Sequence, residues 1–203
     1  MPIETEKLDQ ENLFVLEQAR IEIAKKDYIK ATVLLEADFD DHDVSMANHL
    51  GYIYLSEKNP RRELAKAEKY YRISAEMNNA YGQQGLAACL KRLGKMDEAI
   101  MWLMKSSANE RHQSSYLLYH YFHQTGDIEQ SKKYLACSAR QGNVLAAQRM
   151  AWLKCFGKFG FRSIPAGVVE LFRNSPKAIR YGLAYVESHP HEFEKQKNKL
   201  SLF

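Results

Sequence analysis

Residues 85–110, GLAACLKRLGKMDEAIMWLMKSSANE, contain two short amphipathic segments on either side of Gly94. Small and apolar residues recur in them at helical spacing, at Leu86, Ala87, Leu90, Ala99 and Leu103. Ala87 and Ala99 leave room for two antiparallel helices to approach closely, and Gly94 can adopt the left-handed conformation that ends a helix. The stretch therefore predicts one helix-turn-helix unit.

The same pattern recurs along the chain at a nearly constant separation. One first-helix position is occupied by Gln18, Leu50, Leu86, Leu118 and Met150, at separations of 32, 36, 32 and 32 residues. One second-helix position is occupied by Ala31, Ala67, Ala99 and Ser131, at separations of 36, 32 and 32 residues. Such a period is typical of a helical solenoid. The longer separation indicates an insertion around residues 58–62, and Pro60 is expected in the first turn of the helix that follows.

We therefore predict an all-α fold, a right-handed α-α superhelical solenoid of about five helix-turn-helix repeats with a C-terminal capping helix. The solenoid is expected to form one domain over residues 1–187. The repeats fall at about 12–38, 43–77, 79–109, 111–141 and 143–173, followed by a cap at 175–187 and a polar tail at 188–203. Ser175 as N-cap and Pro176 in the first turn indicate where the cap begins.

Composition and cysteine usage indicate in which cellular compartment the protein is expected. No run of about 18 apolar residues is present, so no membrane insertion is expected. The first twelve residues, MPIETEKLDQEN, are polar and acidic, which is unlike a secretory signal. The cysteines are odd in number and form no repeating pattern: Cys89, Cys137 and Cys155. We expect three unpaired thiols and a cytoplasmic location.

Charge is distributed unevenly along the chain. Residues 1–43 hold twelve acidic and five basic residues, a net charge of −7, whereas residues 140–203 hold eleven basic and four acidic residues, a net charge of +7. One hypothesis is that the two ends engage oppositely charged surfaces, including a homo-oligomer in which copies associate head to tail. The simpler alternative is that the charge is merely scattered over the surface.

Several segments resemble a known repeat family. LGYIY from Leu50, GLAACL from Gly85 and the spacing of Ala99 and Leu103 resemble the tetratricopeptide pattern. KAEKYYRISAEMNNAYG (66–82) and QSKKYLACSARQGNVLAA (130–147) resemble its Sel-one-like (Sel1-like) branch. The resemblance covers roughly residues 12–160 and implies an adaptor or assembly scaffold without catalytic residues or cofactors.

The chain also departs from the family pattern. The tryptophan usual near each repeat start is replaced by Gln83 and Ser115, and the cysteine pairs of the secreted Sel-one-like proteins are missing. The secreted branch is therefore disfavoured.

Residues suited to chemistry are few. His120 and His123 lie three apart on one predicted helix, near His112, but no acidic residue of that helix completes a metal-ligand set. No nucleophile motif is present, GKFGF lacks the P-loop spacing, and FDDHD lacks the ligand series of an EF-hand. We predict no enzyme, no metal and no cofactor.

RNA binding is the alternative function. The basic C-terminal half carries aromatic residues at Phe156, Phe159 and Phe161, and helical-repeat proteins can bind RNA. Its basic residues are nevertheless scattered over several predicted helices, so a protein partner is favoured over nucleic acid.

A partner-binding groove is predicted on the first helices. Leu118 and Phe122 are expected to face the paired helix, which turns the remaining side chains toward the concave surface of a tetratricopeptide-like stack. The predicted groove residues are Asn48, Tyr52, Gln84, Lys91, Arg92, Tyr116, His120, His123, Gln148 and Trp152. Aromatic and amide groups suit a peptide or a partner helix. Only Lys91 and Arg92 could clamp a terminal carboxylate, so a free peptide terminus is not required. The alternatives are a merely solvated face and a Trp152 packed under the cap.

Overall fold

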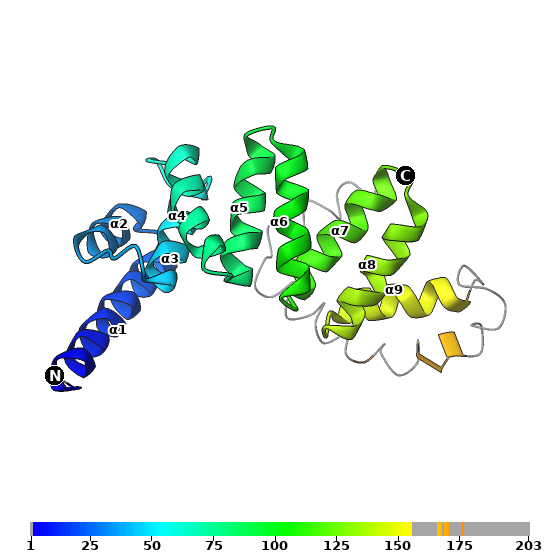
Figure 1. Ribbon diagram of the computed structural model, residues 1–203, viewed down its shortest axis with the longest axis horizontal. Helices are drawn as coiled ribbons and strands as arrows, with labels where there is room; N and C mark the ends of the chain where they lie inside the picture. The colour runs from blue at the N-terminus through cyan, green and yellow to red at the C-terminus, as the bar shows by residue number, and fades with distance from the viewer. Residues whose placement is uncertain (1, 156–165, 168, 171–175, 177–203) are drawn as a thin grey trace. The chain divides into compact units, whose positions relative to one another are not determined.

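The computed structural model describes residues 2–155, 166–167, 169–170 and 176, with side chains from residue 13 onward. Within these residues the chain forms nine α-helices and no strand (Figure 1). The helices are α1 (Pro2–Ala24), α2 (Tyr28–Ala37), α3 (Val44–Leu55), α4 (Leu64–Glu76), α5 (Ala80–Arg92), α6 (Met96–Ala108), α7 (His112–Gln124), α8 (Ile128–Arg140) and α9 (Val144–Cys155). They form the hairpins α1/α2, α3/α4, α5/α6 and α7/α8. Helix α9 follows where the sequence predicts the first helix of a fifth repeat, and most of the predicted second half of that repeat lies outside the described residues.

Short turns join the helices of a hairpin. Gly94 ends α5 with a φ of 78°, and Gly126 follows α7 with a φ of 84°, a region in which glycine is far less strained than other residues. Asp127 then caps α8, because its side chain accepts a hydrogen bond from the backbone N–H of Gln130 at 3.0 Å. One short stretch of sequence thus ends one helix and begins the next.

The repeat period predicted the interior of the hairpins correctly. The small residues at the second-helix position are all buried: Ala31, Ala67, Ala99 and Ser131. At the first-helix position the three central residues, Leu50, Leu86 and Leu118, are fully buried, whereas Gln18 and Met150 are only partly buried. Gln18 and Met150 belong to the first and last of the five first helices, which have a neighbouring repeat on one side only in the described chain.

Gln83 and Ser115, the two polar residues compared above with a tryptophan position, are both buried. Gln83 is buried in α5, where its Nε2 donates to Asn78 Oδ1 at 3.1 Å and its Oε1 accepts from Asn109 Nδ2 at 3.1 Å. Ser115 is buried in α7 and donates to Gln141 Oε1 at 2.6 Å. Because these groups are hydrogen-bonded, their burial is compatible with a stable core.

Two helix starts differ from the sequence-based expectation. Helix α1 begins at Pro2, about ten residues before the predicted first repeat. No helix-breaking residue lies between Pro2 and Asn12, proline is tolerated in a first turn, and Glu4 and Glu6 suit a helix N-terminus.

The second difference concerns Pro60, which lies in the loop before α4 and not in the first turn of that helix, since α4 begins at Leu64. Asn59 holds the loop: its buried Nδ2 donates to the Ile53 carbonyl at 3.0 Å, and its Oδ1 accepts from the Arg61 N–H at 2.9 Å. An asparagine that satisfies backbone groups in this way favours a turn over a helix. The insertion therefore lengthens the connection between α3 and α4.

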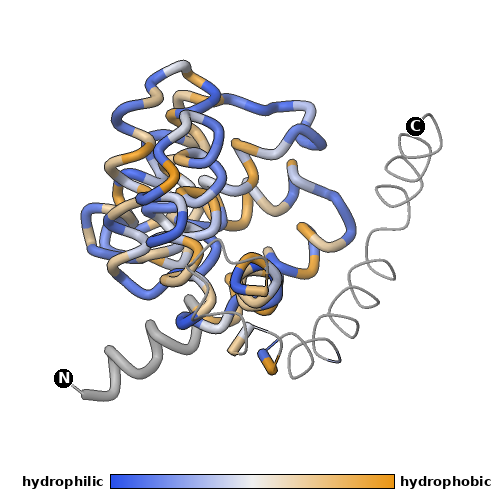
Figure 2. The backbone as a smooth tube through the Cα atoms, turned by 90° about the vertical axis from the view of Figure 1, so that its right-hand side faces the viewer, coloured by the Kyte–Doolittle hydropathy of each residue, from blue (hydrophilic) through white to orange (hydrophobic). Residues whose placement is uncertain are grey.

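The chain divides into two compact units, residues 1–114 and 115–203, with the boundary in the first turn of α7. In the first unit, α3 contacts both α1 and α5, so these three first helices lie side by side. Hydrophobic and hydrophilic positions alternate along the helices (Figure 2). In the second unit, Tyr119, Leu135 and Ala146 form a buried cluster. The predicted cap, apart from Pro176, and the predicted tail lie outside the described residues.

Candidate functional site

A hollow of about 500 Å³ opens on the first helices of the first unit. We call it the tyrosine hollow, and its principal lining residues are Arg20 and Ile23 of α1, Asn48, His49 and Tyr52 of α3, and Tyr81 of α5. Asn48 and Tyr52 were predicted from the sequence as groove residues. The hollow forms because α1, α3 and α5 are successive first helices and present corresponding faces to the same side.

The side-chain oxygen of Asn48 is a hydrogen-bond acceptor to which no described group donates. Its Nδ2 donates to Asn79 Oδ1 at 3.2 Å, and the same Oδ1 caps α5 by accepting from the Gly82 N–H at 2.9 Å. The amide orientation of Asn48 is therefore held by the start of the next repeat. Its Oδ1 is buried and has no hydrogen-bond partner in the described chain. A buried acceptor without a partner favours a ligand that donates a hydrogen bond.

Tyr52 and Tyr81 provide the aromatic surface of the hollow. Each is 41% exposed, which is high for a side chain of this size on a packed helix. Partial burial raises the pKa of Tyr52, and the nearby hydroxyl groups of Tyr28 and Tyr81 raise it further. Tyr52 is therefore neutral at physiological pH and can donate or accept a hydrogen bond.

His49 lines the tyrosine hollow, and Arg111 lies against the lining residue Tyr81. The Nδ1 of His49 donates to the Ser45 carbonyl at 2.7 Å, which leaves its Nε2 as the free ring nitrogen. The guanidinium of Arg111 lies 4.7 Å from the centre of the Tyr81 ring, and its Nε donates to Gln84 Oε1. Gln84 was predicted as a groove residue, and the structure assigns it to holding this arginine.

Arg92 lies at a second, smaller hollow of about 280 Å³, which shares Tyr52 with the first. Its Nη2 donates to Glu57 Oε1 at 3.3 Å. Lys91, its neighbour in the last turn of α5, is exposed and lines neither hollow. The structure therefore groups Arg92 with Tyr52 but groups Lys91 with neither residue.

The second unit brings three predicted residues of α7 together with one that the sequence did not indicate. The ring of His120 lies 4.6 Å from that of Tyr116 in an edge-on contact and 4.8 Å from that of Tyr119. The ring of His123 stacks on Tyr119 at 5.8 Å. Desolvation lowers the pKa of His120, and the charge of Arg149 lowers it further. His120 is therefore neutral at physiological pH.

Helix α9 adds Arg149 to this cluster, since its Nε donates to the Tyr119 hydroxyl at 2.5 Å. Of the two residues predicted on α9, Gln148 is partly buried and Trp152 is 49% exposed. Trp152 thus presents a large apolar surface within the described part of the chain.

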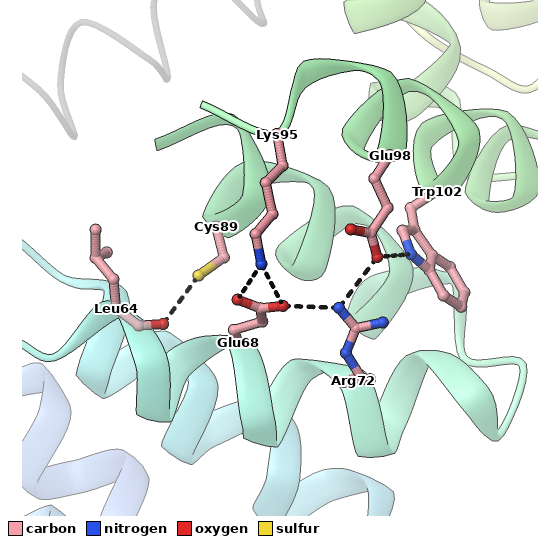
Figure 3. Close-up of polar contacts among 7 residues, drawn as sticks. All are labelled: Leu64, Glu68, Arg72, Cys89, Lys95, Glu98 and Trp102. Carbon is pink, nitrogen blue, oxygen red and sulfur yellow. Dashed lines mark hydrogen bonds and ion pairs between the residues drawn. The ribbon is translucent and has the colours of Figure 1, made fainter. Parts of the chain in front are cut away.

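A separate polar network joins second helices of adjacent repeats (Figure 3). Arg72 of α4 donates to Glu68 at 2.7 Å and to Glu98 of α6 at 3.0 Å. Lys95 donates to Glu68 at 3.3 Å, and the indole of Trp102 donates to Glu98 at 3.4 Å. Every charge in this network has a partner of opposite sign, so we assign it to holding the repeats together.

Three further features of the described part of the chain concern metal binding, thiol reactivity and membrane-spanning helices. Residues 2–155 and the few described beyond them contain no group of three or more His, Cys, Asp or Glu side chains placed to hold a metal ion. Burial raises the pKa of the Cys89 thiol to about 11, which disfavours the reactive thiolate. In the same part of the chain, no helix has the length and apolar character needed to cross a bilayer.

Sequence reasoning missed Tyr81, Arg111, Tyr119 and Arg149. Tyr81 lies three residues before the predicted groove residue Gln84 in α5, and Arg111 lies in the connection before α7, outside the predicted helices. The signal that could have found Tyr81 is its place in the repeat, because NNAYG of residues 78–82 leads directly into a first helix.

The architecture defines the class of the protein as an all-α helical-repeat solenoid. No protein-family description matches the chain, and no curated protein sequence matches it. Among solved structures, it is similar to the crystal structure of a Sel1 repeat protein from Oxalobacter formigenes. The TM-score is 0.65 at 17% sequence identity, over 86% of this chain and 74% of that chain. The Sel1-like repeat fold expected from the sequence is thereby confirmed.

Proposed function

We propose that this protein is a non-catalytic scaffold or adaptor that binds a peptide segment of a partner protein in the tyrosine hollow. The observation that carries the proposal is the hollow itself, about 500 Å³ in volume and formed by three successive first helices. Concave sites between helices are common places for ligands in helical proteins. The Sel1-like repeat fold supports an interaction role by analogy of fold.

The lining residues suit a peptide because they combine apolar contact with backbone recognition. Tyr52 and Tyr81 offer half-exposed rings, and aromatic side chains of this kind dominate the energy of many protein interfaces. The unpaired Oδ1 of Asn48 can accept a hydrogen bond from a peptide N–H. Its orientation is already held by Asn79, so little side-chain freedom is lost on binding.

The cysteines support placing this scaffold in the cytoplasm. All three, Cys89, Cys137 and Cys155, are free thiols. Unpaired thiols in a chain of this size are typical of a reducing compartment.

The proposal is tested by recovering partners from a native lysate with wild type and with the variant Tyr52→Ala/Tyr81→Ala. We expect recovery of the specific partner to fall at least about tenfold, because each ring is a buried anchor in the complex. Val33→Ala/Met101→Ala is the matched control, since it removes two exposed apolar side chains from the second helices α2 and α6. A photo-crosslinking residue placed at His49 should label the same partner.

Equal recovery of every partner by a folded tyrosine variant would contradict the proposal. Tyr116→Ala, measured separately, tests whether the aromatic cluster of Tyr116, Tyr119, His120 and His123 in the second unit contributes to binding of the same partner. Recovery of RNA that persists at high salt would instead favour the RNA-binding alternative, because purely electrostatic retention is lost as salt rises.

A further inference from the structure

Arg111 is a half-buried cation without a carboxylate partner in the described chain. Its Nε donates to the neutral amide of Gln84, and its guanidinium lies over the Tyr81 ring. The partly buried Arg72, in contrast, contacts two carboxylates, at 2.7 and 3.0 Å. Burial lowers the pKa of Arg111, as expected when a charge is desolvated without an opposite charge nearby.

The tyrosine hollow also has a positively charged lining residue, Arg20, that no acidic lining residue balances. It contains no Asp or Glu, and Arg20 on its α1 side forms no ion pair within the described residues. The acidic residue next along α1, Glu22, is already engaged by Lys25 at 3.0 Å and by Lys30 at 3.2 Å. Tyr81 lines the hollow together with Arg20, and Arg111, which is not itself a lining residue, lies over the Tyr81 ring.

An acidic ligand would supply the charge that is missing. Arginine binds carboxylates through two parallel N–H donors, and such charge-assisted bonds are stronger than neutral ones. The Nε of Arg111 is taken by Gln84, which leaves its terminal N–H groups to donate. The Gln84 bond and the Tyr81 ring also restrict how the guanidinium can turn, so the site is partly ordered before a ligand binds.

We propose that the tyrosine hollow selects peptide segments that carry a glutamate or aspartate side chain, whose carboxylate pairs with Arg111 beside Tyr81. Arg20 adds attraction from the opposite side, Tyr52 and Ile23 contact a neighbouring apolar side chain, and Asn48 accepts a hydrogen bond from the peptide backbone. This inference rests on the proposed peptide-binding function and adds the chemistry of the peptide. It requires an internal side chain, not a free peptide terminus.

The test uses the full chain and two pools of short random peptides, acetylated and amidated so that neither end is charged. One pool has glutamate at its central position and the other has glutamine, which has the same shape without the charge. We expect wild type to retain the glutamate pool about tenfold better than the glutamine pool, the ratio that one charge-assisted hydrogen bond supports. Raising the salt from about 50 to about 500 mM should reduce this ratio.

Arg111→Gln should bring the ratio of glutamate-pool to glutamine-pool retention close to one. Arg61→Gln should leave this ratio unchanged. Arg61 is a suitable control because it is exposed in the loop between α3 and α4, outside the residues that line the hollow. Circular dichroism checks that each variant is folded. If Arg111→Gln does not fold, Arg20→Gln takes its place, since Arg20 is exposed on α1 and should lower the ratio by a smaller factor.

The outcomes separate this inference from the function on which it rests. Equal retention of both pools by wild type, with loss of both in Tyr52→Ala/Tyr81→Ala, would overturn the acidic preference and leave the peptide site standing. A preference for glutamate that survives in folded Arg111→Gln and in Arg20→Gln would also overturn it. If wild type retained neither pool, both the inference and the peptide-binding proposal would fail.

Discussion

At the scale of single residues, space around Tyr71 decides how closely the first unit can pack. A Cβ atom added at Gly85 would lie 2.2 Å from Cε1 of the Tyr71 ring, and one added at Gly51 would lie 2.8 Å from its Cγ. Both distances are shorter than any normal contact. The two glycines therefore let α3 and α5 approach the same ring, and burial of that ring raises the pKa of Tyr71.

Ala99 provides a direct test of packing at this scale. It is 2% exposed in α6, so Ala99→Leu should overpack the hairpin and lower the free energy of unfolding by about 1–3 kcal/mol. Thermal or urea denaturation measures the change. Ala65→Leu, at an exposed position of α4, is the control and should have little effect. An unchanged melting temperature for Ala99→Leu would mean that the repeat register is wrong.

At the scale of elements, charged side chains couple the second helices of adjacent repeats. Glu68 of α4 accepts from Arg72 and from Lys95, which directly precedes α6. Arg72 extends the network to Glu98 within α6 (Figure 3). The network links segments that are 26 or 27 residues apart, so it stabilises the contact between repeats and not an isolated helix. Networks of this kind contribute more than single exposed pairs.

Glu68→Gln should destabilise the protein in a pH-dependent way. The hydrogen bond from Arg72, followed by that from Lys95, holds the pKa of Glu68 below its ordinary value of 4.5. A carboxylate with a lowered folded-state pKa stabilises the fold above its unfolded pKa, and that contribution is lost as the pH falls through the folded-state pKa. The free energy of unfolding of wild type should therefore exceed that of Glu68→Gln by about 1 kcal/mol near pH 7, and by less below about pH 4.

Urea unfolding of both proteins between about pH 3 and pH 7 measures this difference. Glu76→Gln is the matched control, because Glu76 is an exposed carboxylate of α4 that forms no ion pair in the described chain. If the difference in the free energy of unfolding between wild type and Glu68→Gln stays constant across the pH range, the ion pairs of Glu68 are not its cause.

At the scale of the whole molecule, the sequence separates negative from positive charge. Residues 1–43 carry −7 and residues 140–203 carry +7. We expect the acidic segment of one copy to attract the basic segment of another, and a head-to-tail contact of this kind to weaken as salt screens it. The association would be heterologous and could extend beyond a dimer.

Sedimentation velocity at high protein concentration tests this expectation. The weight-average sedimentation coefficient should be larger at about 50 mM salt than at about 500 mM, because the screening length falls by roughly a factor of three. A variant with Asp38, Asp40 and Asp41 changed to asparagine should lose the salt dependence while the hairpins remain folded. If the protein is a monomer under both salt conditions, the hypothesis of self-association is wrong.

The repeat period and the interior of the hairpins could be predicted from the sequence by itself. Small residues such as Ala67 and Ala99, recurring 32 residues apart, reflect a packing rule that each hairpin obeys locally. The turns at Gly94 and Gly126 could be predicted for the same reason, since they depend only on neighbouring residues. The loop held by Asn59 could not, because its anchor is the Ile53 carbonyl of the preceding helix.

The candidate site was only partly accessible to sequence reasoning. Asn48 and Tyr52 were predicted from the sequence as groove residues, but only the tertiary structure brings Asn48 to Asn79, 31 residues away, and Arg111 onto the ring of Tyr81. These contacts depend on how far each first helix is rotated about its axis relative to the next. That rotation is decided by close packing between repeats, which a periodic pattern in one chain does not specify.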